Sequence, residues 1–204
     1  MGGVGSQPAT ERTSDVPVIH FLDVTNRDGV QTARTGLSKF GKTMVNFYLG
    51  KLGVAQSEIG FPFLFHEVPY IRANLALAEA GAFGPLRLSG WCRAVAADVE
   101  RAAPLGLRHY NLSLSTSDQM IAHKFRGKLD RKSLITEMTA AVAAAKAAGA
   151  QTVGVNAEDG SRTADKTSGP NPLVLLRIGN PAGDHVGSVS IKSEVWQCSA
   201  FPSR

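Results

Sequence analysis

The stretch LDVTNRDGVQ, residues 22–31, decides between two folds for this chain. It joins a β-rich run to an amphipathic helical run. A dinucleotide-binding sheet has Gly-x-Gly-x-x-Gly after its first strand, whereas this loop has Asn-Arg-Asp-Gly, with the opposite charges of Arg27 and Asp28 side by side. A charged loop of this kind favours a barrel, in which polar strand ends converge on one mouth.

Around this loop the chain alternates β-rich and helical runs. The expected strands are residues 16–24, 54–63, 85–92, 109–116 and 151–157. The expected helices are residues 38–53, 66–82, the region around 95–103, and 130–150. Such alternation predicts a parallel sheet, and its spacing fits both a (β/α) barrel and a doubly wound sheet. With the loop content added, the predicted fold is α/β, a partial (β/α)8 TIM barrel of about five βα strands with a divergent C-terminal tail.

Helix boundaries and buried faces follow from local signals. Ser38 and Asp130 are expected N-caps, Pro69 suits a first helical turn, and Gly81 and Gly149 suit helix ends. The face expected to be buried in residues 38–53 consists of Phe40, Met44, Phe47, Tyr48 and Leu52. In residues 66–82 the expected buried stripe is Val68, Ile71, Leu75 and Ala78.

Composition narrows the class of protein. The 204 residues are 43% hydrophobic and 19% charged, as in one globular domain with a sizeable core. The basic residues that give the net charge of +5 are scattered along the chain and interleaved with acidic residues. This distribution argues against a nucleic-acid partner and for an anionic small molecule as the partner. The two cysteines, Cys92 and Cys198, predict a cytoplasmic chain with reduced thiols. No apolar run approaches the roughly 18 residues of a membrane span, so no membrane partner is expected.

The chain divides into three parts by composition. Residues 1–15 have no apolar core and are expected to be a disordered tail. Residues 16–164 form the predicted barrel part, and residues 165–204 form a Pro/Gly/Ser-rich tail that leaves the pattern. Two short runs in this tail, 173–178 and 186–191, have the length of strands, without an assigned partner. A barrel of five strands leaves two open sheet edges and an uncovered core, which favours association of copies as a homo-oligomer.

Polar side chains follow one strand after another. They are Arg27, Asp28 and Gln31, then Glu58, then Arg93, then Ser115 and Thr116, and finally Asn156 and Glu158. In a barrel these strand ends share one mouth.

Three of these segments resemble one enzyme family. Asp-x-Thr-x-Arg-Asp-Gly-x-Gln at 23–31, Glu-Ile-Gly-Phe-Pro at 58–62 and Asn-Ala-Glu-Asp-x-x-Arg-Thr at 156–163 are similar to signatures of the isopropylmalate synthase and homocitrate synthase family. The resemblance spans residues 16–164. It implies a TIM barrel that uses a divalent metal (Mg, Mn or Zn) to condense acetyl-CoA with a 2-oxo acid, and that is related to hydroxymethylglutaryl-CoA lyase.

The resemblance also implies roles for individual residues. Asp28 matches the metal carboxylate, and Arg27 would donate to the oxygen that becomes negative during the reaction. Glu158 would assist proton transfer or bind substrate. The residues assigned to substrate binding are Gln31, Glu58, Arg93, Thr116 and Arg162.

Structural interpretations remain open beside these roles. Arg27 and Asp28 on their own also fit a solvated turn, and Glu58 and Glu158 also fit structural salt bridges. The basic stretch 123–128 fits either a site for CoA phosphates or a solvated loop. A structural role, rather than a catalytic or metal-binding one, is expected for the side chains of His20, His109 and Cys92.

The departure from the family matters as much as the match. The relatives complete their metal site with a His-x-His pair from late strands, and none of this chain's five histidines forms such a pair. The predicted function is therefore that of an acyltransferase of the family, inactive as this chain alone. The alternatives are a non-catalytic remnant or scaffold and a metal-dependent lyase similar to hydroxymethylglutaryl-CoA lyase.

Overall fold

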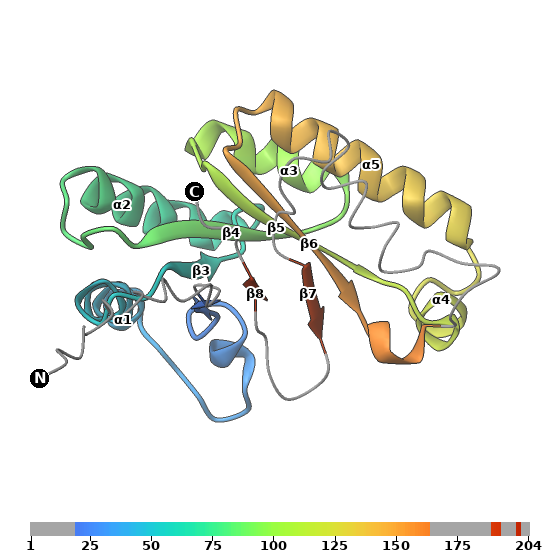
Figure 1. The fold of residues 1–204 in the computed structure, drawn as a ribbon, viewed down its shortest axis with the longest axis horizontal. Coiled ribbons are helices and arrows are strands. Elements are labelled where there is room, and N and C mark those ends of the chain that lie inside the picture. Colours follow the sequence, from blue (N-terminus) through green and yellow to red (C-terminus); the bar gives the residue numbers. More distant parts are fainter. Residues whose placement is uncertain (1–18, 164–188, 193–198, 201–204) are drawn as a thin grey trace, which may run out of the picture.

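The computed structural model describes residues 19–163, 189–192 and 199–200 (Figure 1). Its main sheet has six strands, each parallel to its neighbour. In sheet order they are β2 (Leu22–Asp23), β3 (Gln56–Gly60), β4 (Arg87–Arg93), β5 (His109–Ser115), β6 (Thr152–Glu158) and β7 (Val189–Lys192). A separate two-stranded sheet pairs β1 (Ile19–His20) antiparallel with β8 (Ser199–Ala200).

The order of the strands settles the fold. It follows the chain from β2 to β7 without a reversal, whereas a doubly wound sheet reverses its order at a switch point. The strands form a curled partial TIM barrel, as predicted. Because all these strands are parallel, the loops that follow them lie at one edge of the sheet.

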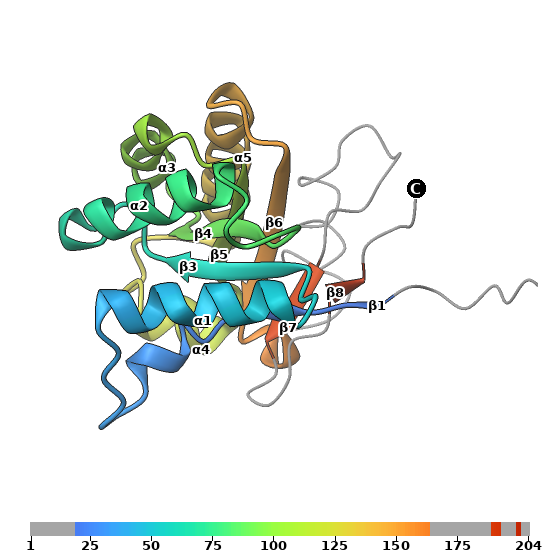
Figure 2. The ribbon, with the colours of Figure 1, turned by 90° about the vertical axis from the view of Figure 1, so that its left-hand side faces the viewer.

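Helices follow the strands on the outside of the curl. They are α1 (Lys39–Lys51), α2 (Val68–Glu79), α3 (Ala96–Ala102), α4 (Asp118–His123) and α5 (Arg131–Ala147). Figure 2 shows α1, α2 and α3 toward the left of the view, with the last strands, β6, β7 and β8, toward the right. Four 3-10 turns complete the described elements: η1 (Gly29–Gln31), η2 (Phe65–Glu67), η3 (Ala103–Leu105) and η4 (Gly160–Arg162).

The predicted caps are confirmed. The Ser38 hydroxyl accepts a hydrogen bond from the Gly41 amide at 3.0 Å, and the Asp130 carboxylate accepts one from the Ser133 amide at 2.7 Å. The short helix α4 was not predicted. It begins after Ser117, whose hydroxyl accepts from the Met120 amide at 3.2 Å. Six residues give too little periodicity for sequence analysis to detect.

The two faces of the strands differ in chemistry. Toward the helices, alternate residues of β5 and β6 are apolar and buried: Tyr110, Leu112, Leu114, Val153, Val155 and Ala157. They pack with buried residues of α5, namely Leu134, Met138, Ala141, Val142 and Ala145. The alternate positions, on the inner face, are polar: Asn111, Ser113, Ser115, Asn156 and Glu158. The apolar core therefore lies between the sheet and the helices.

The predicted buried face of residues 38–53 is wrong at three of its five residues, while Met44 and Phe47 are half-buried and Phe47 packs against the core. Phe40, Tyr48 and Leu52 have exposed fractions of 73%, 58% and 78%, and the buried residues of the helix are Lys42 and Asn46. The reason is that α1 packs against polar groups that satisfy one another, so burial on this side follows hydrogen bonding rather than hydropathy. The prediction for α2 holds at Ile71, which is fully buried, while Val68, Leu75 and Ala78 are half-buried.

The outer parts of the chain are described only in places. The expected first strand, 16–24, is interrupted at Phe21, so that β1 and β2 belong to different sheets. Strand β7 overlaps the run 186–191 and pairs parallel with β6, which gives this run a partner. The expected N-terminal tail, residues 1–15, and the run 173–178 lie outside the described residues.

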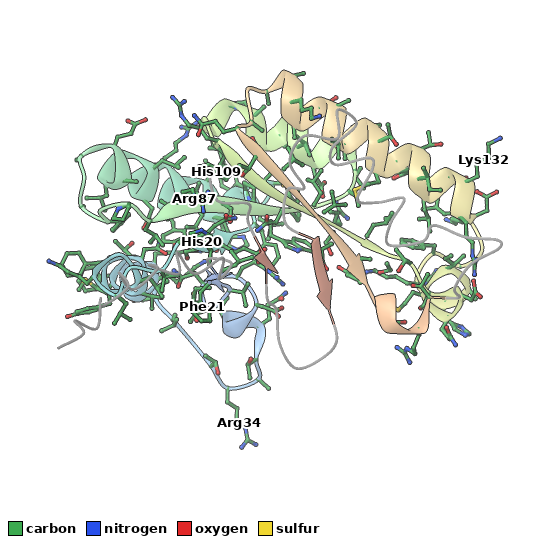
Figure 3. The ribbon with its side chains drawn as sticks, viewed as in Figure 1. His20, Phe21, Arg34, Arg87, His109 and Lys132 are labelled. Atoms are coloured by element: carbon green, nitrogen blue, oxygen red, sulfur yellow. The ribbon has the colours of Figure 1, made fainter. Side chains whose placement is uncertain are left out.

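Cys92 and His109 belong to the structure rather than to a reactive site. Burial raises the pKa of the Cys92 thiol, which therefore stays protonated. His109, labelled with Arg87 in Figure 3, lies at the amino end of β5, and its Nδ1 is 2.8 Å from the Thr152 hydroxyl. Burial, together with Arg87 and Arg108, lowers the His109 pKa to about 4. His109 is therefore neutral at pH 7.

Candidate functional site

Arg27 is the centre of the candidate site. Its side chain is 3% exposed, yet two carboxylates hold it: Nε donates to Glu58 Oε2 at 2.6 Å and Nη1 donates to Asp28 Oδ1 at 2.7 Å. The guanidinium carbon lies 5.2 Å from the centre of the Trp91 ring. Among the described residues, the buried Nη2 has no hydrogen-bond partner. A buried charged donor without a partner is costly, and an oxygen atom of a ligand or of a water molecule at this place would satisfy it.

The loop that presents Arg27 is folded by its own motif. The Asp23 carboxylate accepts from the amide and the hydroxyl of Thr25, each at 3.0 Å. The Val24 carbonyl then accepts from the amides of Arg27, Asp28 and the following glycine at 3.1, 2.7 and 3.2 Å. An aspartate that closes a turn two residues on, followed by a tight set of amides, gives the loop a defined geometry. The spacing of aspartate, threonine and arginine in the motif is therefore explained by this turn.

Glu58 orients the arginine and links three strands. Its Oε1 accepts from Asn111 Nδ2 at 2.7 Å, while its Oε2 accepts from Arg27. Asn111 also donates to the Ser89 hydroxyl at 3.3 Å. Both carboxylate oxygens of Glu58 are thus used by protein groups from β5 and from the loop after β2.

Glu158 forms a second cluster at the same edge of the sheet. It accepts from the hydroxyls of Ser113 and Ser115 at 2.8 and 2.6 Å and from Lys124 Nζ at 2.8 Å. Burial alone would raise the pKa of Glu158, but Lys124 and the two hydroxyls hold it below its ordinary value. Glu158 is therefore ionised at neutral pH.

The remaining predicted residues lie around these clusters. Thr116 is buried, and its hydroxyl donates to the Glu158 carbonyl at 3.2 Å and lies 2.6 Å from the Thr163 hydroxyl. Gln31 is exposed in η1. The Arg93 side chain is 59% exposed and is paired with Asp98 at 2.6 and 2.7 Å, and Arg162 is 61% exposed and paired with Asp159 at 2.6 Å.

The structure thus brings Arg27, Asp28 and Glu58 into direct contact and places Glu158 and Thr116 at neighbouring strand ends. Sequence analysis missed the partners of these residues, which are Trp91, Asn111, Ser113 and Lys124. For Asn111 and Ser113 a signal was present, because they alternate with the apolar residues of β5. Lys124 lies in the basic stretch 123–128, where its partner Glu158 gives it a local role.

A divalent metal would need more ligands than the described residues supply. Within the described part of the chain, no group of three or more His, Cys, Asp or Glu side chains is arranged to hold a metal ion. Asp28 offers a half-exposed carboxylate, one oxygen of which already accepts from Arg27. Metal sites usually have several protein ligands, so these residues alone do not fit a closed site.

Comparisons with known proteins agree with the fold and the motifs. Residues 18–168 match the family model described as HMGL-like. The chain belongs to the HMGL-like family. This family includes proteins named citrate, isopropylmalate and homocitrate synthases, and it is generally dependent on a divalent metal.

Two curated relatives show how far the similarity extends. A "Citrate (Re)-synthase" of Dehalococcoides mccartyi is 59% identical over 148 residues, which are 71% of this chain and 35% of the relative. A "2-isopropylmalate synthase 2" of Caldanaerobacter subterraneus is 36% identical over 149 residues, 73% of this chain and 37% of the relative. The chain therefore spans about a third of the length of the curated relatives that it matches.

The solved structures support the fold alone. The HMG-CoA lyase of Brucella melitensis aligns with a TM-score of 0.64 at 16% identity, over 88% of this chain and 62% of that chain.

None of the helices that the structure describes has the length and apolar character of a membrane span.

Proposed function

We propose that this chain contains the 2-oxo acid side of a condensing acyltransferase that joins the acetyl group of acetyl-CoA to a 2-oxo acid. The observation on which this rests is the buried Nη2 of Arg27, a donor with a fixed position and no partner among the described residues. A fixed cationic donor binds a carbonyl oxygen more strongly as that oxygen becomes negative, an effect worth about 3–4 kcal/mol for one such donor.

The reaction assigns a separate task to each cluster. A base removes a proton from the methyl group of the acetyl thioester, and the electron pair left on carbon forms a bond to the carbonyl carbon of the 2-oxo acid. The electrons of the carbon–oxygen π bond move to oxygen, next to Arg27 Nη2. Water then cleaves the thioester and releases CoA. We assign Glu158 to proton transfer, because it is a carboxylate that is ionised at neutral pH and lies at the carboxyl end of β6.

Oxaloacetate is the proposed 2-oxo acid. Addition of an acetyl unit to its carbonyl gives citrate, and the relative that is 59% identical is named for that product. The relatives named for isopropylmalate are 30–36% identical and those named for homocitrate are 31–34% identical, which supports those substrates less. The lyase alternative has only a likeness of fold to support it.

The site residues of the family remain proposals for this chain. Asp28 is proposed as one metal ligand, and Gln31, Arg93, Thr116 and Arg162 are proposed to contact the substrate. Glu58, whose carboxylate bonds to Arg27 and Asn111, is proposed to line the same pocket. Arg93 and Arg162 would first have to leave Asp98 and Asp159. Because the described residues do not complete a metal site, we propose that this chain does not turn over on its own.

Binding of citrate tests the proposal without requiring turnover. In a Trp196→Phe background Trp91 is the only tryptophan, and it lies beside Arg27. We expect citrate to change the Trp91 fluorescence with a lower Kd than 2-oxoglutarate or 2-oxoisovalerate. Arg27→Lys should raise the citrate Kd by about tenfold or more, since hydrogen bonds to charged groups contribute about 1.5–3 kcal/mol.

Arg72→Lys is the matched control, because Arg72 is an exposed residue of α2. It should leave the Kd unchanged. If none of the three acids alters the fluorescence, or if Arg27→Lys binds citrate as tightly as the parent, the proposed site is wrong. The scaffold alternative is the one that such a result would favour.

A further inference from the structure

A buried asparagine on α1 is connected to both halves of the Arg27–Glu58 ion pair. Asn46 Oδ1 accepts from Asn26 Nδ2 and from the Ser57 hydroxyl, each at 2.9 Å. Asn26 precedes Arg27 in the loop after β2, and Ser57 precedes Glu58 in β3. One oxygen atom therefore contacts the neighbour of each partner of the pair.

Side-chain alternation makes this arrangement act on the ion pair. Successive residues of a strand point to opposite faces, so Ser57 points to α1 while Glu58 points to the inner face of the sheet. Asn26 likewise reaches α1, where its Nδ2 also donates to the Lys42 carbonyl at 2.9 Å. The two residues held by Asn46 are thus fixed on one side of the sheet, and the two charged residues meet on the other.

The orientation of the Asn46 amide is fixed from both ends. The Lys42 carbonyl can only accept a hydrogen bond, so the NH2 group of Asn26 must face it. The same NH2 group faces Asn46, which must therefore accept through its side-chain oxygen. On the other side, Asn74 donates to the Tyr70 carbonyl at 3.0 Å and so presents its oxygen to Asn46 Nδ2, at 2.9 Å. Residue 46 must therefore present an acceptor on one side and a donor on the other, and the amide of Asn46 supplies both.

Burial makes these bonds strict. Asn26, Asn46, Ser57 and Asn74 are all fully buried. Removal of one partner from such a network leaves a polar group without water and without a replacement. The position of Arg27 relative to Glu58 therefore depends on Asn46 through two short paths, each of one hydrogen bond and one peptide link.

We propose that Asn46 is a positioning residue that sets the Arg27–Glu58 pair and thereby the direction of Arg27 Nη2. It touches neither charged residue and acts only through Asn26 and Ser57. The importance of that direction for catalysis rests on the proposed function, but the geometric statement does not.

The Nε–H of Arg27 gives a direct readout in 15N–1H NMR spectra of the full chain. Its signal is identified by its loss in Arg27→Lys, and its exchange with water reports the hydrogen bond to Glu58. In Asn46→Ala we expect this exchange to become about tenfold faster, which corresponds to about 1.4 kcal/mol of lost hydrogen bonding. Ser57→Ala, a smaller change, should speed the exchange severalfold and serves as the deciding variant if Asn46→Ala does not fold.

Asn74→Ala is the matched control. It removes an equally buried asparagine from the same network but leaves the contacts of Asn46 Oδ1 in place. It should lower stability without altering the Arg27 Nε–H exchange by more than about twofold, a change under about 0.5 kcal/mol. An unchanged Arg27 signal in folded Asn46→Ala, or in Ser57→Ala if Asn46→Ala does not fold, would overturn the proposal. So would an equal change in Asn74→Ala.

Citrate titration of the same samples separates this inference from the proposed function. If the Arg27 signal responds as expected but citrate does not bind the parent chain, the positioning role stands and the proposed function fails. If citrate binds the parent and Asn46→Ala binds it with the same Kd and the same Arg27 signal, the positioning role fails alone.

Discussion

Replacement of Glu58 by glutamine tests whether the Arg27–Glu58 pair is as buried as the structure shows. Both side chains are 3% exposed. The Glu58 carboxylate accepts from two donors, Arg27 Nε and Asn111 Nδ2, whereas an amide has only one oxygen to offer. In Glu58→Gln one donor therefore faces an NH2 group, and the only charged partner that the buried guanidinium keeps among the described residues is Asp28, which is 40% exposed.

The expected loss is large relative to the total stability. Breaking a buried ion pair from one side costs about 3–5 kcal/mol, and the retained contact to Asp28 places this variant near the lower end, about 3 kcal/mol. A domain has about 5–15 kcal/mol in total. With a urea m-value of about 1–3 kcal/mol/M, the unfolding midpoint should fall by about 1–3 M.

Urea unfolding followed by circular dichroism measures this loss. Asp118→Asn is the control, because it makes the same chemical change in the Arg131–Asp118 pair, where Asp118 is 63% exposed. An exposed pair is worth about 0–1 kcal/mol, so the control should unfold nearly as the parent does. Equal midpoints for Glu58→Gln and Asp118→Asn would refute the burial of the pair and, with it, the reasoning about Arg27.

Four further outcomes are expected. The folded-state pKa of His109 is about 4, which is below the unfolded value of about 6.5. The contribution of His109 to the free energy of unfolding is therefore complete above about pH 6.5 and falls by about 1.4 kcal/mol per pH unit as the pH is lowered toward 4. His109→Gln should remove this pH dependence from the free energies measured by urea unfolding between those pH values. Weak Mn²⁺ binding, measured by calorimetry, should disappear in Asp28→Asn while the circular dichroism spectrum is retained, and equal binding in both proteins would argue against Asp28 as a ligand. The chain should associate with rising concentration in light scattering, less so in the double variant Phe40→Lys, Leu52→Lys, and a parent that stays monomeric at every concentration would contradict this. Release of CoA from acetyl-CoA with oxaloacetate should stay at background for this chain, and turnover that a chelator abolishes would show the opposite.

Local signals were sufficient for much of the fold. Ser38 and Asp130 capped helices as predicted because a cap depends on the next three residues only. The strand at residues 109–115 followed from the alternation of Tyr110 and Leu112 with polar neighbours. The motif at 23–31 placed Arg27 and Asp28 in the loop that follows a strand, where the structure has them.

Long-range polar contacts were beyond the reach of the sequence pattern. The face of α1 was mispredicted because Asn46 is buried by partners 20 and 28 residues away, Asn26 and Asn74, which a hydropathy pattern does not register. The contact of Asn111 with Glu58 joins residues 53 positions apart and needs the register of three strands. Trp91 was missed for the same reason, since only this register places its ring beside Arg27.

The polar inner face of the sheet leaves the helix side as the place where the described strands bury their apolar residues. Buried side chains on this face form hydrogen bonds: Asn156 donates to the Ser113 hydroxyl at 3.2 Å, and Asn111 donates to Glu58 Oε1 at 2.7 Å, while the apolar core lies on the opposite, helix-facing side. Each βα unit buries its apolar residues against its own helix and the next one. Such an architecture resembles a linear array of repeats, whose stability grows by neighbour-to-neighbour interfaces rather than by closure of the ring. Within the described part of the chain, unfolding should accordingly begin at the ends of the array, where β2 pairs with β3 alone, and reach β5 last.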